Sequence, residues 1–237
     1  MEREAKLNVI AIDGPAASGK TTVGHLLAQK LGFLLLDTGC MYRATTLAAL
    51  KSGVAVEDET AVAQLAQTIT IDVKPPANEG DGRHYTTFLD GRDVTWELRS
   101  PAVDTHVSLV SSYPGVRREM VRRQRQFGLR GKVVMVGRDI GTIVMPDAPL
   151  KLYITATAEE RARRRLLDRQ KQGHHTSYAD ILADVQRRDK FDSSRQHSPL
   201  RPADDAIIID ATEQTADELV QIILRLVKER LASIEAS

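Results

Sequence analysis

Short apolar runs recur along the chain, and the intervals between them carry apolar residues at helical spacing. In the interval 21–31, for example, Val23, Leu27 and Leu31 fall on one helical face, and Gly32 follows as a stop signal. Continuous apolar runs that alternate with amphipathic helices predict a parallel sheet buried between two helical layers. We therefore expect a three-layer α/β/α fold with a five-stranded parallel sheet, its strands at 7–12, 33–36, 133–136, 150–154 and 206–209.

One stretch does not fit this alternation. The segments 69–73 and 84–89 have strand-like composition, and prolines and glycines lie between them. Asp90-Gly91 then supplies the residues of a tight hairpin turn. We expect a small antiparallel insertion over about 68–98, after which helices resume at Pro101 and Pro114.

Composition sets limits on function. The 237 residues are 42% hydrophobic, and 33 Lys plus Arg balance 32 Asp plus Glu, so no overall basic field implies nucleic-acid binding. Cys40 is the only cysteine, which excludes an internal disulfide and a multi-cysteine metal site. No apolar run approaches the ~18 residues of a membrane helix. We expect a soluble, cytoplasmic protein, with no membrane partner, that acts as a monomer.

Arginines crowd the segment 117–130 at positions 117, 118, 122, 123, 125 and 130. Aromatic residues that stack on bases do not interleave with them, so the pattern does not favour an RNA surface. We expect these arginines to form a solvated helix face, with Arg117 as the exception, and we expect no nucleic-acid partner.

A phosphate-binding motif lies between the first predicted strand and the first predicted helix. Gly14-Pro-Ala-Ala-Ser-Gly-Lys-Thr21 matches the P-loop pattern G-x-x-x-x-G-K-[ST] at every constrained position. The glycines let backbone N–H groups surround phosphate oxygens, Lys20 reaches the β- and γ-phosphates, and the Thr21 hydroxyl binds Mg²⁺. We expect a nucleoside triphosphate site made by Gly14, Pro15, Ala16, Ala17, Ser18, Gly19, Lys20, Thr21 and Thr22.

The acceptor of the phosphoryl group is less restricted by the residues themselves. Arg43 and Arg138 follow predicted strands, and Arg188 and Arg195 lie on and after a helix. Guanidinium groups in such number suit an acceptor that already carries a phosphate, which needs no base to become nucleophilic. Simple hydrolysis stays open, as does a hydroxyl acceptor with Asp37 or Asp139 as the base.

Ordered motifs along most of the chain resemble the bacterial cytidylate kinases, a family of P-loop nucleoside monophosphate kinases. The motifs are Ile12-Asp-Gly-Pro15, Leu36-Asp-Thr-Gly-Cys-Met-Tyr-Arg43, Gly137-Arg-Asp-Ile-Gly-Thr142, Arg188-Asp-Lys-Phe-Asp-Ser-Ser-Arg195 and Ser198-Pro-Leu200. The resemblance implies a P-loop NTPase fold and transfer from ATP, with Mg²⁺, to CMP or dCMP. It also implies one kinase unit over 1–237, with core segments 1–37, 109–160 and 175–237, a nucleoside-monophosphate-binding region 38–108 and a lid at about 161–174.

The same resemblance implies roles for single residues. Lys20, Arg43, Arg138 and Asp139 would act in catalysis. The cytosine edge would be read by Ser108, Arg117 and Asp139, the ribose would be held by Arg188 and Asp192, and the acceptor phosphate would be held by Arg43, Arg138 and Arg195, with Thr38 nearby.

Val136 departs from the pattern that the resemblance suggests, because relatives often carry an acid directly before Gly-Arg-Asp. An acid there would support Mg²⁺, and Asp13 or Asp37 are the candidates to replace it. Two alternatives to a CMP kinase stay open. One is a kinase for UMP, another monophosphate or a small hydroxyl compound. The other is a nucleotide-dependent binding protein that has lost catalysis.

Overall fold

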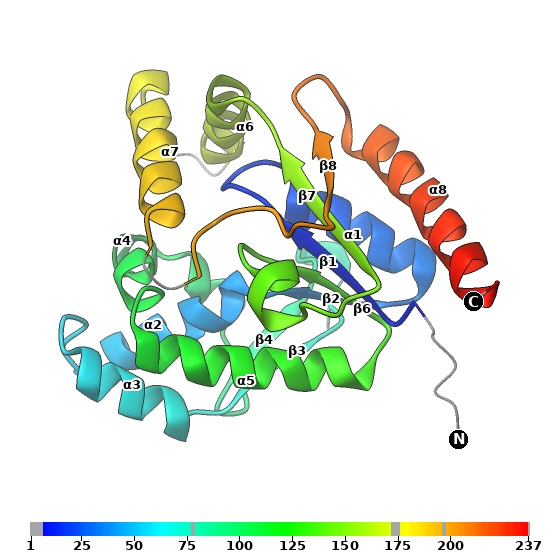
Figure 1. The fold of residues 1–237 in the computed structure, drawn as a ribbon. Coiled ribbons are helices and arrows are strands. Elements are labelled where there is room, and N and C mark those ends of the chain that lie inside the picture. The colour runs from blue at the N-terminus through cyan, green and yellow to red at the C-terminus, as the bar shows by residue number, and fades with distance from the viewer. Residues whose placement is uncertain (1–6, 77–78, 172–175, 196–197, 237) are drawn as a thin grey trace.

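A computed structural model describes residues 7–76, 79–171, 176–195 and 198–236, and its centre is a five-stranded parallel sheet (Figure 1). The strand order is β2-β6-β1-β7-β8, and every neighbouring pair runs parallel. The strands are β1 (Val9–Asp13), β2 (Leu34–Asp37), β6 (Val133–Val136), β7 (Leu150–Thr155) and β8 (Ile207–Asp210). The predicted fold is confirmed, and each strand lies within two residues of its predicted bounds.

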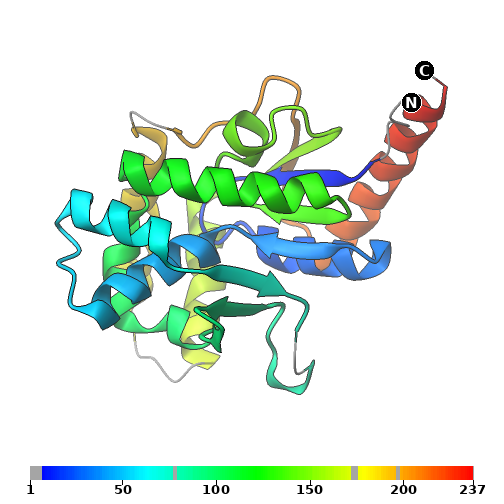
Figure 2. The same ribbon diagram turned by 90° about the horizontal axis from the view of Figure 1, so that it is seen from below.

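The two faces of the sheet are buried under separate helical layers, as Figure 2 shows from below. Along β1, Val9 and Ala11 join one apolar cluster while Ile10 and Ile12 join the other. This alternation follows from the two-residue period of a strand. The helices are α1 (Lys20–Leu31) and α8 (Ala216–Glu235) on one face, and α2 (Gly39–Ser52), α3 (Glu59–Thr68), α4 (Pro101–Val110) and α5 (Pro114–Arg130) on the side of the other.

The predicted insertion is a separate antiparallel sheet. Its strands are β3 (Ile71–Lys74), β4 (Thr86–Leu89) and β5 (Arg92–Asp93). Asp90 and Gly91 form the turn with φ values of 49° and 79°, the left-handed conformation that this residue pair tolerates. Ile71 and Leu89 pack into the same apolar cluster as α2 and α3, so the insertion is anchored to the core.

Two helices stand beyond the carboxyl edge of the sheet as a packed pair (Figure 1). These are α6 (Ala158–Lys171) and α7 (Tyr178–Ser193), and their shared contact contains Ala162, Ile181 and Val185. The expected lid corresponds to α6, while positions 172–174 of that range lie outside the described residues. Among the described residues, no helix has the length and apolar composition needed to cross a membrane.

The prediction that the arginines of α5 form a solvated face is wrong for Arg123, which is half-buried, whereas Arg125 is exposed although it also contacts a neighbouring segment. Arg123 donates to the carbonyl oxygens of Ile69 at 2.7 Å and Ala66 at 2.9 Å. Arg125 donates to the carbonyl oxygen of Ile143 at 2.7 Å. These side chains cap backbone carbonyls that helix ends and turns leave without partners, so they fasten α5 to neighbouring segments. Arg117 is buried, as the exception made for it requires.

Candidate active site

The carboxyl ends of three adjacent strands place the polar motifs at one edge of the sheet. Val136 of β6 is paired in register with Ile12 of β1 and with Asp37 of β2. The P-loop, the residues after β2 and the Gly137-Arg138-Asp139 segment therefore begin side by side. Ligands of open parallel sheets bind at this edge, where neighbouring connections leave in different directions.

The phosphate loop curls tightly against β7. Gly14 has a φ of 145°, and a Cβ placed on it would lie 2.0 Å from the carbonyl oxygen of Ile154. Gly19 has a φ of 88° and precedes α1 directly. The first glycine is thus required by close approach as well as by conformation, and the loop leads its N–H groups into a helix N-terminus, an arrangement that favours anions.

Lys20 lies inside this loop. Its ammonium donates to the carbonyl oxygen of Pro15 at 2.5 Å and to the Ser18 hydroxyl at 3.3 Å, and the residue is only 4% exposed. Burial lowers the pKa of Lys20 well below its usual value, and the charge of Arg138 adds to this effect. A buried ammonium with a second cation beside it is stabilised by a bound anion, which is what a P-loop lysine requires.

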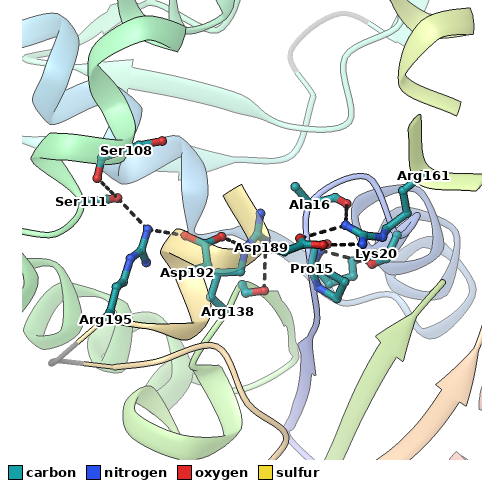
Figure 3. A network of polar contacts seen from close by, with 12 residues as sticks. Pro15, Ala16, Lys20, Ser108, Ser111, Arg138, Arg161, Asp189, Asp192 and Arg195 are labelled. Carbon is teal, nitrogen blue, oxygen red and sulfur yellow. Dashed lines mark hydrogen bonds and ion pairs between the residues drawn. The ribbon is translucent and has the colours of Figure 1, made fainter. Parts of the chain in front are cut away.

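Arg161 supports the loop from α6 (Figure 3). Its guanidinium donates to the carbonyl oxygen of Ala16 at 3.2 Å and makes a bidentate pair with Asp189 of α7, with distances of 2.9 and 2.5 Å. The family resemblance placed Arg161 only within the range of the expected lid. The structure shows that this arginine, 4% exposed, joins the P-loop to both helices.

The aspartates that end β1 and β2 make different contacts. Asp13 accepts from the backbone N–H groups of Ile140 at 2.8 Å and Gly141 at 2.7 Å, so both of its oxygens organise the turn after Asp139. Burial raises its pKa to about 6. Asp37 instead accepts from the Thr21 hydroxyl at 2.7 Å. Of the two candidates to support a metal, only Asp37 contacts the predicted metal ligand.

Val136 belongs to the apolar core between the sheet and α1. It is 1% exposed, and its Cγ2 lies 2.8 Å from the position that a Cβ on Gly24 would occupy. The absence of a side chain at Gly24 therefore makes room for the branched residue at position 136. This pair closes the space between β6 and α1 immediately beyond Thr21.

A network of arginines and aspartates lies on the other side of Lys20 from Arg161 (Figure 3). Asp192, 6% exposed, accepts from Arg138 Nε at 3.1 Å and pairs with Arg195 at 2.5 Å. Arg195 also reaches the Ser111 hydroxyl at 3.3 Å. One carboxylate of α7 thus holds two of the predicted phosphate-binding arginines in fixed positions.

Arg117 and Asp139 form a second buried pair. Asp139 accepts from Arg117 Nη2, and Arg117 Nη1 donates to the carbonyl oxygen of Ser111 at 3.0 Å. Arg117 is 5% exposed and Asp139 is 4% exposed. Ser108 is half-buried one helical turn before Ser111, whose hydroxyl donates to the Ser108 carbonyl oxygen at 3.0 Å. The three residues expected at the cytosine edge therefore converge on the segment joining α4 and α5.

The space between these two networks contains more arginine side chains than carboxylates that pair with them. Arg43 donates to the carbonyl oxygen of Leu98 at 2.8 Å and pairs with Asp104 at 2.7 Å. Arg188 is half-buried, and its side chain forms no hydrogen bond or ion pair with another described residue. Burial and the nearby charge of Arg138 together lower the pKa of Arg188 to about 10.

Thr38 does not display its hydroxyl in this space. The group donates to the carbonyl oxygen of Val136 at 3.0 Å, and the residue is 3% exposed. It fixes the start of α2 against β6. Arg161 and Asp189 were not singled out by the motifs, because their role depends on a contact with Ala16 far away in the sequence.

A P-loop at the carboxyl edge of a five-stranded parallel sheet, faced by an excess of arginine, defines the class of P-loop phosphotransferases. The family model for cytidylate kinase matches residues 10–229. The cytidylate kinase of Bacillus pumilus is 48% identical over 215 residues, which cover 91% of this chain and 93% of the relative. That of Chloroflexus aggregans is 48% identical over 91% of each chain. The chain therefore belongs to the cytidylate kinase family, as its motifs predicted.

Proposed function

We propose that this protein transfers the γ-phosphoryl group of ATP to CMP or dCMP, giving ADP and the pyrimidine diphosphate. The observation that carries the proposal is a cluster of buried and half-buried cations on both sides of the point where the phosphoryl group would be transferred. Lys20 lies within the P-loop, while Arg138, Arg188 and Arg195 converge from the opposite side. Two phosphate chains repel each other, and positive charge fixed between them offsets that repulsion.

In this reaction an oxygen of the acceptor phosphate attacks the γ-phosphorus, and the bond from that phosphorus to the β-bridging oxygen breaks. ADP leaves with the electron pair. The acceptor phosphate is ionised near neutral pH, so the protein does not have to remove a proton. Catalysis then consists of alignment and charge stabilisation by Lys20, Arg43 and Arg138, with Arg195 holding the acceptor phosphate.

A hydroxyl acceptor is disfavoured, because the two aspartates that could act as its base, Asp37 and Asp139, already have hydrogen-bond or ion-pair partners. Asp37 accepts from Thr21 and Gly39 N, at 2.7 and 3.0 Å. Asp139 is paired with Arg117. A general base must reach the proton it removes, and carboxylates already engaged in this way are poorly suited to that task.

We propose that the buried Arg117–Asp139 pair reads the cytosine edge. Cytosine presents an amino group at C4 beside an acceptor at N3, whereas uracil presents an acceptor beside an N–H. Asp139 is acceptor-only and Arg117 is donor-only when both are ionised. In the proposed arrangement Asp139 accepts from the C4 amino group and Arg117 donates to N3, and Ser108 adds a hydroxyl that can donate or accept. We propose that Arg188 and Asp192 hold the ribose.

Mg²⁺ fits the oxygens that face the phosphate loop. The Thr21 hydroxyl and the Asp37 carboxylate are hard oxygen donors of the kind that Mg²⁺ prefers. Within the described part of the chain, no group of three or more His, Cys, Asp or Glu residues is placed to bind a metal. The ion would therefore take its remaining ligands from water and from the phosphates, whose charge it neutralises.

Initial rates with ATP and Mg²⁺ against CMP, dCMP, UMP and AMP test the proposal. We expect CMP and dCMP to react fastest. The matched variants are Arg195→Met and Arg187→Met, because Arg195 is proposed to hold the acceptor phosphate, whereas Arg187 is a nearby arginine of α7 with a side chain 74% exposed. Loss of a clamping arginine should lower turnover by about 10²-fold or more, whereas the exposed control should keep the parental rate.

The same assay separates the remaining alternatives. A preference for UMP would replace the proposed acceptor. A parent that binds ATP but has no activity on any monophosphate, and gains activity on Val136→Asp, would indicate a nucleotide-dependent binding protein derived from a kinase. Activity of the wild-type protein on a monophosphate would exclude a binding protein that has lost catalysis.

A further inference from the structure

The guanidinium group of Arg43 on α2 is held by two acceptors that come from one short segment. Its Nη1 atom donates to the carbonyl oxygen of Leu98 at 2.8 Å and pairs with Oδ1 of Asp104 at 2.7 Å. Leu98 lies in the 3₁₀ turn η2 (Glu97–Arg99), and Asp104 lies in the first turn of α4. Helices α2 and α4 pack against each other, so this segment reaches Arg43 directly (Figure 1).

These two contacts leave the opposite edge of the Arg43 guanidinium open. Its Nε and Nη2 atoms form no hydrogen bond or ion pair with another described residue. Guanidinium groups bind phosphate through two parallel N–H groups, and Nε together with Nη2 forms such an edge. An arginine anchored through Nη1 alone therefore presents a fixed pair of donors to an anion.

The other carboxylate oxygen of Asp104 faces α6. Oδ2 lies 4.0 Å from Nη2 of Arg169, and about a third of each side chain is exposed, 33% and 34%. Arg165, one turn earlier on α6, pairs with Asp184 at 3.3 Å. Burial lowers the pKa of Arg165, and Asp104 is among the charges that act on it. Asp104 is thus a carboxylate placed among several arginines, and its charge offsets their mutual repulsion.

Two other roles of this carboxylate make different predictions. A carboxylate in the first turn of a helix stabilises the positive end of the helix dipole, and this effect does not depend on any ligand. A carboxylate close to a bound phosphate repels it, so its removal would strengthen phosphate binding. Anchoring of an arginine predicts the opposite sign, because a guanidinium that has lost its anchor must be ordered when the anion binds.

We propose that Asp104 is a positioning residue that orients Arg43 toward the phosphate of the acceptor nucleotide. The proposal rests on the proposed function, because it takes Arg43 to contact the acceptor phosphate. Asp104 does not touch the substrate. It holds Nη1 of Arg43 together with the Leu98 carbonyl group, and this leaves the Nε and Nη2 edge for the phosphate.

Calorimetric titration with CMP tests this role. We expect Asp104→Ala to bind CMP about 10-fold more weakly than wild type, the lower end of the worth of a hydrogen bond to a charged group. Asp104→Asn keeps an acceptor oxygen for Nη1 and should stay within about 3-fold of wild type. Affinity for ADP should be the same in all three proteins. The matched control is Asp217→Asn, which removes an exposed aspartate from the first turn of α8 and should bind CMP as wild type does.

A double-mutant cycle shows whether Asp104 acts through Arg43. Once Arg43→Met has removed the guanidinium, Asp104→Ala has nothing left to position and should not weaken CMP binding further. An equal loss with and without Arg43 would overturn the assignment. Unchanged or tighter CMP binding by Asp104→Ala would overturn it as well.

Two further outcomes separate this proposal from its alternatives. A lower melting temperature of Asp104→Ala with reduced affinity for both CMP and ADP would show a structural role and overturn the assignment. Failure of wild type to bind or phosphorylate CMP would instead contradict the proposed function. An active wild type with unaltered Asp104 variants would leave that function intact and remove only the role of Asp104.

Discussion

Replacing Gly14 by alanine tests the geometry on which the donor site depends. The added Cβ would lie 2.0 Å from the carbonyl oxygen of Ile154, whereas real Cβ atoms essentially never approach closer than 3.0 Å. The obstacle is backbone of β7, the strand paired with β1, so it has little freedom to move. The phosphate loop must therefore shift by about 1 Å or more, and a misplacement of about 1 Å can cost 10²-fold in turnover.

Gly53→Ala separates this steric effect from backbone conformation. Gly53 has a φ of 71° and no atom within 4 Å of an added Cβ. We expect it to lower the free energy of unfolding by about 1–2 kcal/mol and leave kinetics unchanged. Gly14→Ala should lose about 10²-fold in turnover and in affinity for ADP, measured by coupled assay and calorimetry. Wild-type affinity and turnover in Gly14→Ala would refute the reasoning.

Three further predictions concern charge and packing. Asp192→Asn leaves the guanidinium groups of Arg138 and Arg195 without their shared counter-charge. Denaturant titration should therefore show that the free energy of unfolding falls by about 2–4 kcal/mol, and the KM for CMP should rise. Unchanged values of both quantities would show that the network is not needed. Because burial raises the pKa of Asp13 from 3.8 to about 6, its protonated form stabilises the native state below pH 4, and that contribution disappears as the pH rises through 6. The unfolding free energy of wild type minus that of Asp13→Asn should therefore fall by up to about 3 kcal/mol over this interval, and a constant difference would contradict the assigned cause. Met120→Ala, at a residue 0% exposed, should cost about 2–5 kcal/mol in the same titration without changing the KM for CMP, unless the site can collapse around the smaller side chain.

The sequence was sufficient for features that depend on neighbours along the chain. The strand at 133–136 was predicted at its observed bounds, because a continuous apolar run flanked by polar residues suits only a buried position. The hairpin at Asp90-Gly91 followed from the conformations that these two residues tolerate. The P-loop could be recognised because its chemistry uses consecutive residues.

Local sequence patterns could not identify which aspartate supports the metal. Asp13 and Asp37 each follow an apolar strand, and nothing nearby in the sequence distinguishes them. Only the folded chain shows that Asp13 is used by the backbone of Ile140 and Gly141 while Asp37 contacts Thr21. The same limit applies to Arg123 of α5, because it donates to carbonyl oxygens of a segment more than fifty residues earlier in the sequence.

The amino-acid sequence by itself thus determined the alternation of strands and helices, the phosphate loop and the family, since periodicity and consecutive motifs are local properties of a chain. Tertiary structure alone decided which residues remote in the sequence contact one another. It joined Ala16 to Arg161 and Arg138 to Asp192. Hydrogen bonds and ion pairs depend on distances of about 3 Å between side chains, and only folding brings residues that are remote in sequence within that reach.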